Sequence, residues 1–117
     1  MMEAFARELE VYITEEQRAP FLDWLDALRD TRGRAKIRTR LDRVRLGNFG
    51  DCASIGDGVE ELRIDFGPGY RVYFAQVSSE VVLLLWGGDK STQVKDVHEA
   101  KSYWKDYRRR SSGRGNK

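Results

Sequence analysis

Residues 61–74, which read ELRIDFGPGYRVYF, decide the fold because they predict two β-strands joined by a tight turn. Apolar and polar residues alternate on both sides of the Gly-Pro-Gly turn at 67–69, so Leu62 and Ile64 share one face of the first strand. Strands that are joined by so short a turn pair in antiparallel fashion. We therefore expect an antiparallel sheet built outward from this hairpin.

Three further stretches carry the two-residue period or the apolar run of a strand. Leu9, Val11 and Ile13 alternate with polar residues, and residues 52–55 form a short candidate strand before a glycine-rich turn. Residues 81–86, VVLLLW, read as a strand that is apolar on both faces. The sheet is expected to contain four or five strands.

Three segments show the periodicity of a helix. Apolar residues recur at helical spacing over residues 21–28, after Thr14 as the expected N-cap, and again over residues 37–44. We expect these two helices to form an αα-hairpin on one face of the sheet. A last helix is expected to begin at Ser91 or Thr92. The sequence thus predicts an α+β fold: a small twisted antiparallel sheet with an N-terminal αα-hairpin on one face and a C-terminal helix.

Length and composition limit the classes of protein to which the chain can belong. A chain of 117 residues, 40% hydrophobic and 34% charged, is large enough for one domain that folds without a disulfide or a metal. The single cysteine, Cys52, cannot form an internal disulfide. The N-terminus lacks the features of a signal peptide, and the longest apolar run, 81–86, is far shorter than the roughly 20 residues of a membrane span. We expect a cytoplasmic protein with no membrane partner and no metal or small-molecule cofactor.

Charge is segregated along the chain. The net charge is −5 over residues 1–28, +6 over 29–45, −4 over 46–107 and +5 over 108–117. The last ten residues contain no apolar side chain, so we predict a single domain over 1–107 and a disordered basic tail over 108–117. The basic blocks are either solvated surfaces or surfaces that meet a polyanion such as RNA.

Two arginines lie inside segments that otherwise read as buried strands. If the helices cover one face of the sheet, Arg63 and Arg71 become neighbours on the open face, together with Tyr73. Arginine is rarely buried without a partner. The pattern is typical of a site that holds an anion such as phosphate; ordinary salt bridges to Glu61 and Asp65 are the alternative interpretation.

Lys90 adds a third cation at the end of the apolar strand. It follows two glycines and immediately precedes the last predicted helix, where backbone N–H groups and the helix dipole favour an anion. The hydroxyl of Ser91 is a further donor. The alternative is a simple turn capped by Asp89 or Ser91, and Gly-Gly-Asp-Lys is too short for a phosphate-binding P-loop.

The chain resembles the HigB-like, phage Gp49-like branch of the RelE/ParE toxin superfamily, whose members are called addiction-module killer proteins. The resemblance covers about residues 10–107 and is carried by 35–41 (AKIRTRL), 47–51 (GNFGD), 58–63 (GVEELR), 67–74 (GPGYRVYF) and 83–93 (LLLWGGDKSTQ), with Lys95 and Ala100 beyond. It implies a RelE/ParE-like fold and a toxin of a type II toxin–antitoxin pair. HigB-like and RelE-like relatives cut mRNA, usually on the ribosome, whereas ParE-like relatives inhibit DNA gyrase.

The resemblance also implies roles for individual residues. Arg71 matches the phosphate-binding arginine of the family, Lys90 a second cation and Arg63 a third, while His98 is one residue out of register with a catalytic residue of the last helix. The expected catalytic residues are therefore Arg71, Lys90, Arg63 and His98. The expected RNA- or phosphate-binding residues are Arg63, Arg71, Tyr73, Lys90, Ser91, Lys95, Arg40 and Arg43, and no residue is expected to bind a metal.

Together with the cluster of cations, the resemblance implies a metal-free mRNA endoribonuclease that arrests translation, with mRNA, the ribosome and a helix-turn-helix, HigA-like antitoxin as partners. The 2′-hydroxyl of RNA would attack the adjacent phosphate, while Arg71 and Lys90 stabilise the developing charge. The general acid and base stay open among Lys90, His98, Tyr70 and Tyr73, or a contribution of the ribosome. The alternative is a toxin without nuclease activity, either a ParE-like gyrase inhibitor or a module that only binds its antitoxin.

Overall fold

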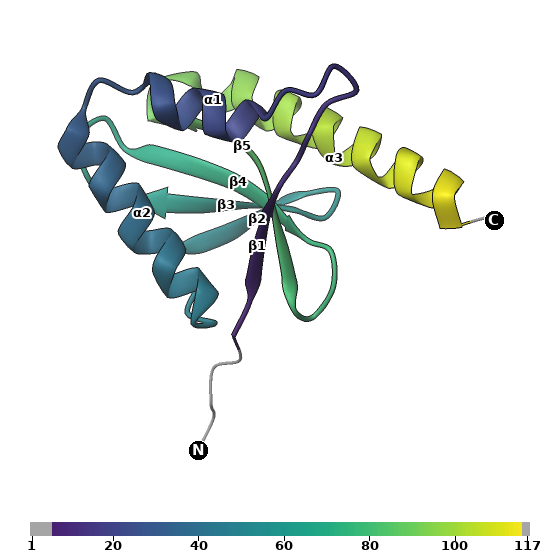
Figure 1. The fold of residues 1–117 in the computed structure, drawn as a ribbon. Coiled ribbons are helices and arrows are strands. Elements are labelled where there is room, and N and C mark those ends of the chain that lie inside the picture. The colour runs from purple at the N-terminus through teal and green to yellow at the C-terminus, as the bar shows by residue number, and fades with distance from the viewer. Residues whose placement is uncertain (1–5, 116–117) are drawn as a thin grey trace.

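The computed structural model describes residues 6–115 as a five-stranded sheet with helices on both faces (Figure 1). Residues 1–5, on which our expectation about a signal peptide falls, and residues 116–117 of the predicted tail lie outside the described residues. The elements in chain order are β1 (Glu8–Val11), α1 (Pro20–Ala27), α2 (Thr31–Arg45), β2 (Cys52–Gly56), β3 (Val59–Ile64), β4 (Tyr70–Gln76), β5 (Val81–Asp89), a 3₁₀ turn (Lys90–Thr92) and α3 (Gln93–Gly115).

The strands lie in the order β1-β5-β4-β3-β2. The pairs β2–β3, β3–β4 and β4–β5 are antiparallel, as the short connections between them predict. The prediction of a wholly antiparallel sheet is wrong, because β1 runs parallel to β5 and the sheet is mixed. No hairpin turn joins β1 to β5. Both helices and three strands intervene in the chain, so connection length places no constraint on the direction of this pair.

Helices α1 and α2 cover one face of the sheet. Phe21 and Leu25 of α1, together with Ile37 and Leu41 of α2, are buried against the strands. Their partners include the residues that the hairpin pattern assigns to one face, and these are Leu62, Ile64, Val72 and Phe74. The predicted inward faces of both helices and of the hairpin are therefore confirmed.

The opposite face of the sheet is not open as predicted, because α3 packs across it. Ala100 and Trp104 of α3 form a second core with Tyr73 and Leu85 of the sheet. Helix α3 carries an apolar stripe that needs a surface to cover, and this face offers apolar side chains. The run of apolar residues at 81–86 already indicates burial on both faces.

Two helix starts differ from the sequence prediction. Thr14 does not cap α1; its hydroxyl accepts a hydrogen bond from the backbone N–H of Arg18 at 3.1 Å, and α1 begins at Pro20. Proline suits the first turn of a helix because that N–H has no intrahelical partner. Helix α2 begins at Thr31, well before the predicted stretch at 37–44, because Asp30 is its N-cap and accepts from the N–H of Gly33 at 2.9 Å.

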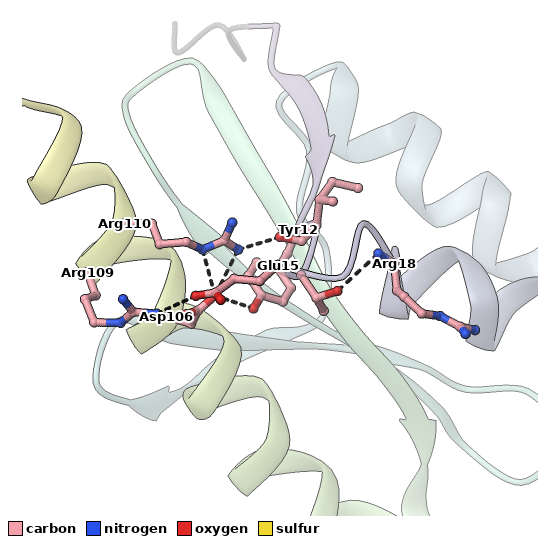
Figure 2. Close-up of polar contacts among 8 residues, drawn as sticks. Tyr12, Glu15, Arg18, Asp106, Arg109 and Arg110 are labelled. Carbon is pink, nitrogen blue, oxygen red and sulfur yellow. Dashed lines mark hydrogen bonds and ion pairs between the residues drawn. The ribbon is translucent and has the colours of Figure 1, made fainter.

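Helix α3 continues through most of the predicted tail, as far as Gly115 (Figure 1). Asp106 explains much of this order: it accepts hydrogen bonds from the Tyr12 hydroxyl at 2.6 Å and from Nε of Arg110 at 3.0 Å, and it also pairs with Arg109 (Figure 2). Arg110 in addition donates to the carbonyl of Ile13. These contacts attach α3 to the segment after β1. Between residues 6 and 115, no helix is both long enough and apolar enough to cross a membrane.

Candidate functional site

The three cations expected at the site line one cavity. Arg63 of β3 lies directly opposite Arg71 of β4, and Arg71 lies opposite Gly88 of β5, so a row of paired positions crosses three strands. Lys90 follows two residues after Gly88. The cavity has a volume of about 290 Å³ and is lined by Asp51, Arg63, Ile64, Asp65, Gly69, Arg71 and Lys90. We call it the cationic cavity.

Glu61 is a fully buried carboxylate next to the two arginines. Its carboxylate accepts from Nε of Arg63 at 3.0 Å and from the side-chain amide of Gln93 at 2.7 Å, and it lies 3.6 Å from Nη1 of Arg71. The hydrogen bond to Glu61 also raises the pKa of Arg63. Glu61 is thus confirmed as a resting partner of both arginines.

Asp65, the other expected partner, is not paired with either arginine. The second carboxylate near Arg63 is that of Asp51, at 3.9 Å, while Asp65 only lines the cavity. Strand β3 ends at Ile64, so the alternation that would place Asp65 beside Arg63 no longer applies. The prediction for Asp65 is wrong for this reason.

Arg71 is the less satisfied of the two arginines of the site. Its side chain is 13% exposed, and its Nε is buried without a hydrogen-bond partner among residues 6–115. The ion pair with Glu61, at 3.6 Å, is longer than a normal hydrogen bond. A guanidinium has five N–H donors in a planar fork, and a buried donor without a partner is costly. Arg71 is therefore equipped to bind an anion that enters the cavity.

Tyr73 does not reach the cationic cavity. It is fully buried beneath α3, and its hydroxyl has no hydrogen-bond partner within residues 6–115. Burial, followed by the nearby charges of Glu61 and Asp96, raises its pKa well above the ordinary value. The expectation that Tyr73 contacts RNA depended on an open face and is wrong.

The predictions for the turn after β5 are confirmed only in part. The Asp89 side chain accepts from the N–H of Ser91 at 2.8 Å and also from the Ser91 hydroxyl, so the capped turn that we considered as an alternative is present. Ser91 is thereby engaged with Asp89. Lys90 is exposed and has no carboxylate within ion-pair distance in the described part of the chain. Lys95 is exposed on α3 and does not line the cavity.

Arg40 stabilises the wall of the cavity from the α2 side. Its guanidinium donates to the carbonyls of Phe49 at 3.0 Å, Asp51 at 3.2 Å and, at shorter range, Arg63. Burial lowers its pKa. Arg40 is therefore engaged with the backbone and is not available for phosphate as predicted; it fixes the loop that carries Asp51 and the end of β3.

Arg43 and His98 lie outside the cavity. Both are exposed, and neither is among the residues that line it. The expected catalytic role of His98 and the expected RNA contact of Arg43 thus have no support from the geometry of this site. Nowhere in residues 6–115 do three or more His, Cys, Asp or Glu side chains gather in a way that suits a metal ion.

Comparison with known proteins gives one clear relationship. The chain is 53% identical over 81 residues to an uncharacterized protein of Haemophilus influenzae, and the matched region is 69% of this chain and 82% of the relative. The chain belongs to the family of this Haemophilus protein. No family model matches the chain.

In this member of the Haemophilus protein's family, the contacts of two polar side chains on α3, the partly buried Gln93 and the buried Asp96, were missed from the sequence. Gln93 holds Glu61, as described above, and Asp96 accepts from Nε1 of Trp86 at 2.8 Å and from the Thr92 hydroxyl. A Cβ atom at Gly88 would lie 1.7 Å from the Asp96 carboxylate, so this glycine is required for close packing of α3. The four-residue spacing of Thr92 and Asp96 at a helix start was a signal for this contact.

Proposed function

We propose that this chain is the toxin of a type II toxin–antitoxin pair and acts in the cytoplasm as a metal-free mRNA endoribonuclease. The observation that carries the proposal is the convergence of Arg63, Arg71 and Lys90 on one cavity, where Nε of Arg71 is buried without a partner among residues 6–115. The resemblance to HigB-like toxins supports it, because all three residues belong to the tracts that carry the resemblance. In the same proposal the fold is RelE/ParE-like, and α1 and α2 form its N-terminal helical hairpin.

The proposed reaction is an attack of the RNA 2′-oxygen on the adjacent phosphorus. The bond from phosphorus to the 5′-oxygen breaks, which gives a 2′,3′-cyclic phosphate and a free 5′-hydroxyl. The proton of the 2′-hydroxyl passes to a base, and the leaving oxygen takes a proton from an acid. Negative charge grows on the non-bridging oxygens in between, where the planar fork of Arg71 and the ammonium of Lys90 stabilise it.

The groups that line the cavity restrict the choice of acid and base. The Tyr70 hydroxyl donates to Asp30 at 2.8 Å on the other face of the sheet, and burial raises the pKa of Tyr70 to about 12. Tyr73 is buried. We therefore assign Lys90 as the donor of the proton to the leaving oxygen, and one of the two cavity carboxylates, Asp51 or Asp65, as its acceptor from the 2′-hydroxyl.

The proposed partners are those that the resemblance implies: mRNA, the ribosome and a helix-turn-helix antitoxin. Exposed bases on α2 and on the C-terminal half of α3 support contact with a large polyanion. Such contacts supply affinity that falls steeply with salt, and they do not require the cavity.

Expression of the Arg71→Ala variant without antitoxin tests the proposal. We expect wild-type chain to arrest growth and to leave new mRNA ends, with both effects lost in Arg71→Ala. Arg29→Ala is the matched control, because Arg29 is an exposed arginine that lies outside the cavity and outside both α2 and α3, and it should behave as wild type. Unchanged growth arrest by a folded Arg71→Ala protein, verified by circular dichroism, would contradict the nuclease assignment.

A second candidate is a toxin without nuclease activity, such as a ParE-like gyrase inhibitor or a module that only binds antitoxin. It is favoured by the buried carboxylate of Glu61, which already faces both arginines, and by the position of the single histidine, His98, outside the cavity. A supercoiling assay with purified gyrase separates the two. Inhibition of gyrase without new RNA ends would establish the second candidate.

A further inference from the structure

A second hollow, which the proposed function does not use, lies between α1 and α3. Its volume is about 430 Å³, and its walls include Pro20 and Trp24 from α1, Trp86 from β5 and Tyr103 from α3. All three rings are partly exposed, and Trp86 and Tyr103 meet edge to face at 6.0 Å between ring centroids. We call it the aromatic groove. A neighbouring cavity of about 280 Å³ shares Tyr103 and extends the groove along α3.

Carboxylates surround the aromatic groove. Glu16 and Asp23 line it together with Arg18, and Glu15 and Asp106 line the adjoining cavity. Arg18 pairs with Asp23 at 3.0 Å, and Figure 2 shows this arginine on the segment that leads into α1. Glu16 is exposed and has no hydrogen-bond or ion-pair partner in the described part of the chain. Glu15 and Asp106 are both paired with Arg109, so Glu16 is the carboxylate of the groove that is available to an incoming cation.

This chemistry selects the occupant. The face of an aromatic ring attracts a cation, most strongly for tryptophan, and neighbouring carboxylates add to the attraction. The same carboxylates repel a nucleic-acid backbone, so RNA does not fit this groove. Apolar ring surface also favours the stem of a long basic side chain, which can lie along the rings while its charge meets the acids.

We propose that the aromatic groove binds a segment of a partner protein that presents a lysine or arginine side chain between apolar residues. The incoming cation lies over Trp24 and Trp86 and pairs with Glu16, while its apolar neighbours cover Pro20 and Tyr103. Arg18 already places a guanidinium beside Asp23 at the rim of the groove, which is the same type of contact within the chain.

The three tryptophans provide a direct readout. Trp24 and Trp86 line the groove, whereas Trp104 of α3 does not line it, lies beneath Arg108 and serves as an internal control. We would titrate the ¹⁵N-labelled chain with blocked peptides Ala-Leu-Arg-Leu-Ala, Ala-Leu-Gln-Leu-Ala and Ala-Leu-Glu-Leu-Ala and follow the indole N–H resonances. We expect saturable shifts of Trp24 and Trp86 only, with the arginine peptide binding at least about threefold more tightly than the glutamine peptide.

Substitutions test where the peptide binds and whether binding needs the negative charge of Glu16. Glu16→Gln should weaken the arginine peptide by at least about threefold, while Glu10→Gln, an exposed acid on β1 outside the groove, should leave binding unchanged. Arg71→Ala should also bind as wild type, so failure of this proposal is distinct from failure of the nuclease proposal. The proposal would be overturned if the glutamate peptide bound as tightly as the arginine peptide, if only Trp104 shifted, or if no indole resonance shifted. It would also be overturned if the chain formed a dimer that dissociates in Glu16→Lys, because a second copy of the chain would then occupy the groove.

Discussion

Arg71 in the cationic cavity and Arg110 near the end of α3 are two partly buried arginines with opposite surroundings. Arg110 donates to Asp106 and to the carbonyl of Ile13, and its guanidinium lies 5.6 Å from the centre of the Tyr12 ring (Figure 2). Arg71 donates no hydrogen bond to any residue in 6–115 and has one carboxylate, at 3.6 Å. The first arrangement stabilises the fold, whereas the second leaves donors for a ligand.

The register of the sheet adds to this difference. Arg63 and Arg71 are directly opposed across two strands, a position in which like charges destabilise a sheet. Glu61 compensates both from a fully buried position. The cavity therefore has unfavourable charge repulsion that a bound anion would relieve, while the cluster around Asp106 balances its arginines with a carboxylate and a phenol.

The largest expected effect is that of Glu61→Ala, which removes the buried carboxylate and leaves the two arginines opposed. We expect the free energy of unfolding to fall by about 3 kcal/mol, as for other broken buried pairs. Urea unfolding at pH 7 measures the loss. Sodium sulfate should restore more stability to this variant than to Glu60→Ala, the control from the same strand, because an anion can replace the missing carboxylate. If sulfate raised the stability of both variants equally, the gain would reflect only the general stabilising effect of sulfate on folded proteins.

Arg71→Lys should separate catalysis from folding. Lysine keeps the charge but loses the planar fork, so on the proposed function cleavage falls by about 10²-fold. Because Arg71 donates no hydrogen bond within residues 6–115, the free energy of unfolding should change by less than about 0.5 kcal/mol. Primer-extension assays and urea unfolding on the same preparation give both values. Loss of stability without loss of cleavage would show that Arg71 is structural.

The features of this site that arise from residues close together in the chain were predicted from the sequence, and those that arise from residues far apart were not. The alternation around the turn at 67–69 placed Arg63 opposite Arg71, and the register confirms it. The coverage by α3 was missed, because an antiparallel hairpin alone does not reveal what packs on its second face. Tyr73 was therefore expected at the surface and is buried. Arg40 was read from a basic helix, whereas its three backbone acceptors lie outside that helix, 9, 11 and 23 residues further along the chain.

The segment predicted to be a disordered tail also depends on a contact between residues that are far apart in the chain. Residues 108–110 are three arginines, no apolar residue follows them in the chain, and composition alone indicates disorder. Their order depends on Asp106 and on Tyr12, which is 94 residues away in sequence from Asp106. A contact of that separation leaves no periodic pattern, so it could not be predicted from a single sequence.

Arg110→Lys should lower stability and leave cleavage unchanged, which is the reverse of what we expect for Arg71→Lys. Lysine cannot donate to Asp106 and to the Ile13 carbonyl with the same geometry, so the free energy of unfolding should fall by about 1 kcal/mol. On the proposed function cleavage should be unchanged. Urea unfolding and primer extension test this variant beside Arg71→Lys. A loss of cleavage equal to that of Arg71→Lys would contradict the division between a stabilising and a ligand-binding arginine.

Tyr12→Phe should have an effect no larger than that of Arg110→Lys, because it removes one hydrogen bond to Asp106 and should cost at most about 1 kcal/mol at pH 7. Burial, with the bond to Asp106, raises the pKa of Tyr12 from 10.0 to about 12, so folding favours the protonated phenol. This stabilisation is present below pH 10 and is lost as the pH rises toward 12.

The pH dependence at the acid end has the opposite sign. The Tyr12 hydroxyl, followed by the hydrogen bonds from Arg109 and Arg110, lowers the pKa of Asp106 below its ordinary value of 3.8. The stabilisation from the ionised carboxylate is present above that value and is lost as the pH falls below it. The stability difference between wild type and Tyr12→Phe should therefore be largest near neutral pH and should narrow toward both pH 3 and pH 12. Equal stability of wild type and Tyr12→Phe at every pH would show that Tyr12 stabilises α3 by ring packing against Tyr103, which phenylalanine keeps, and not through Asp106.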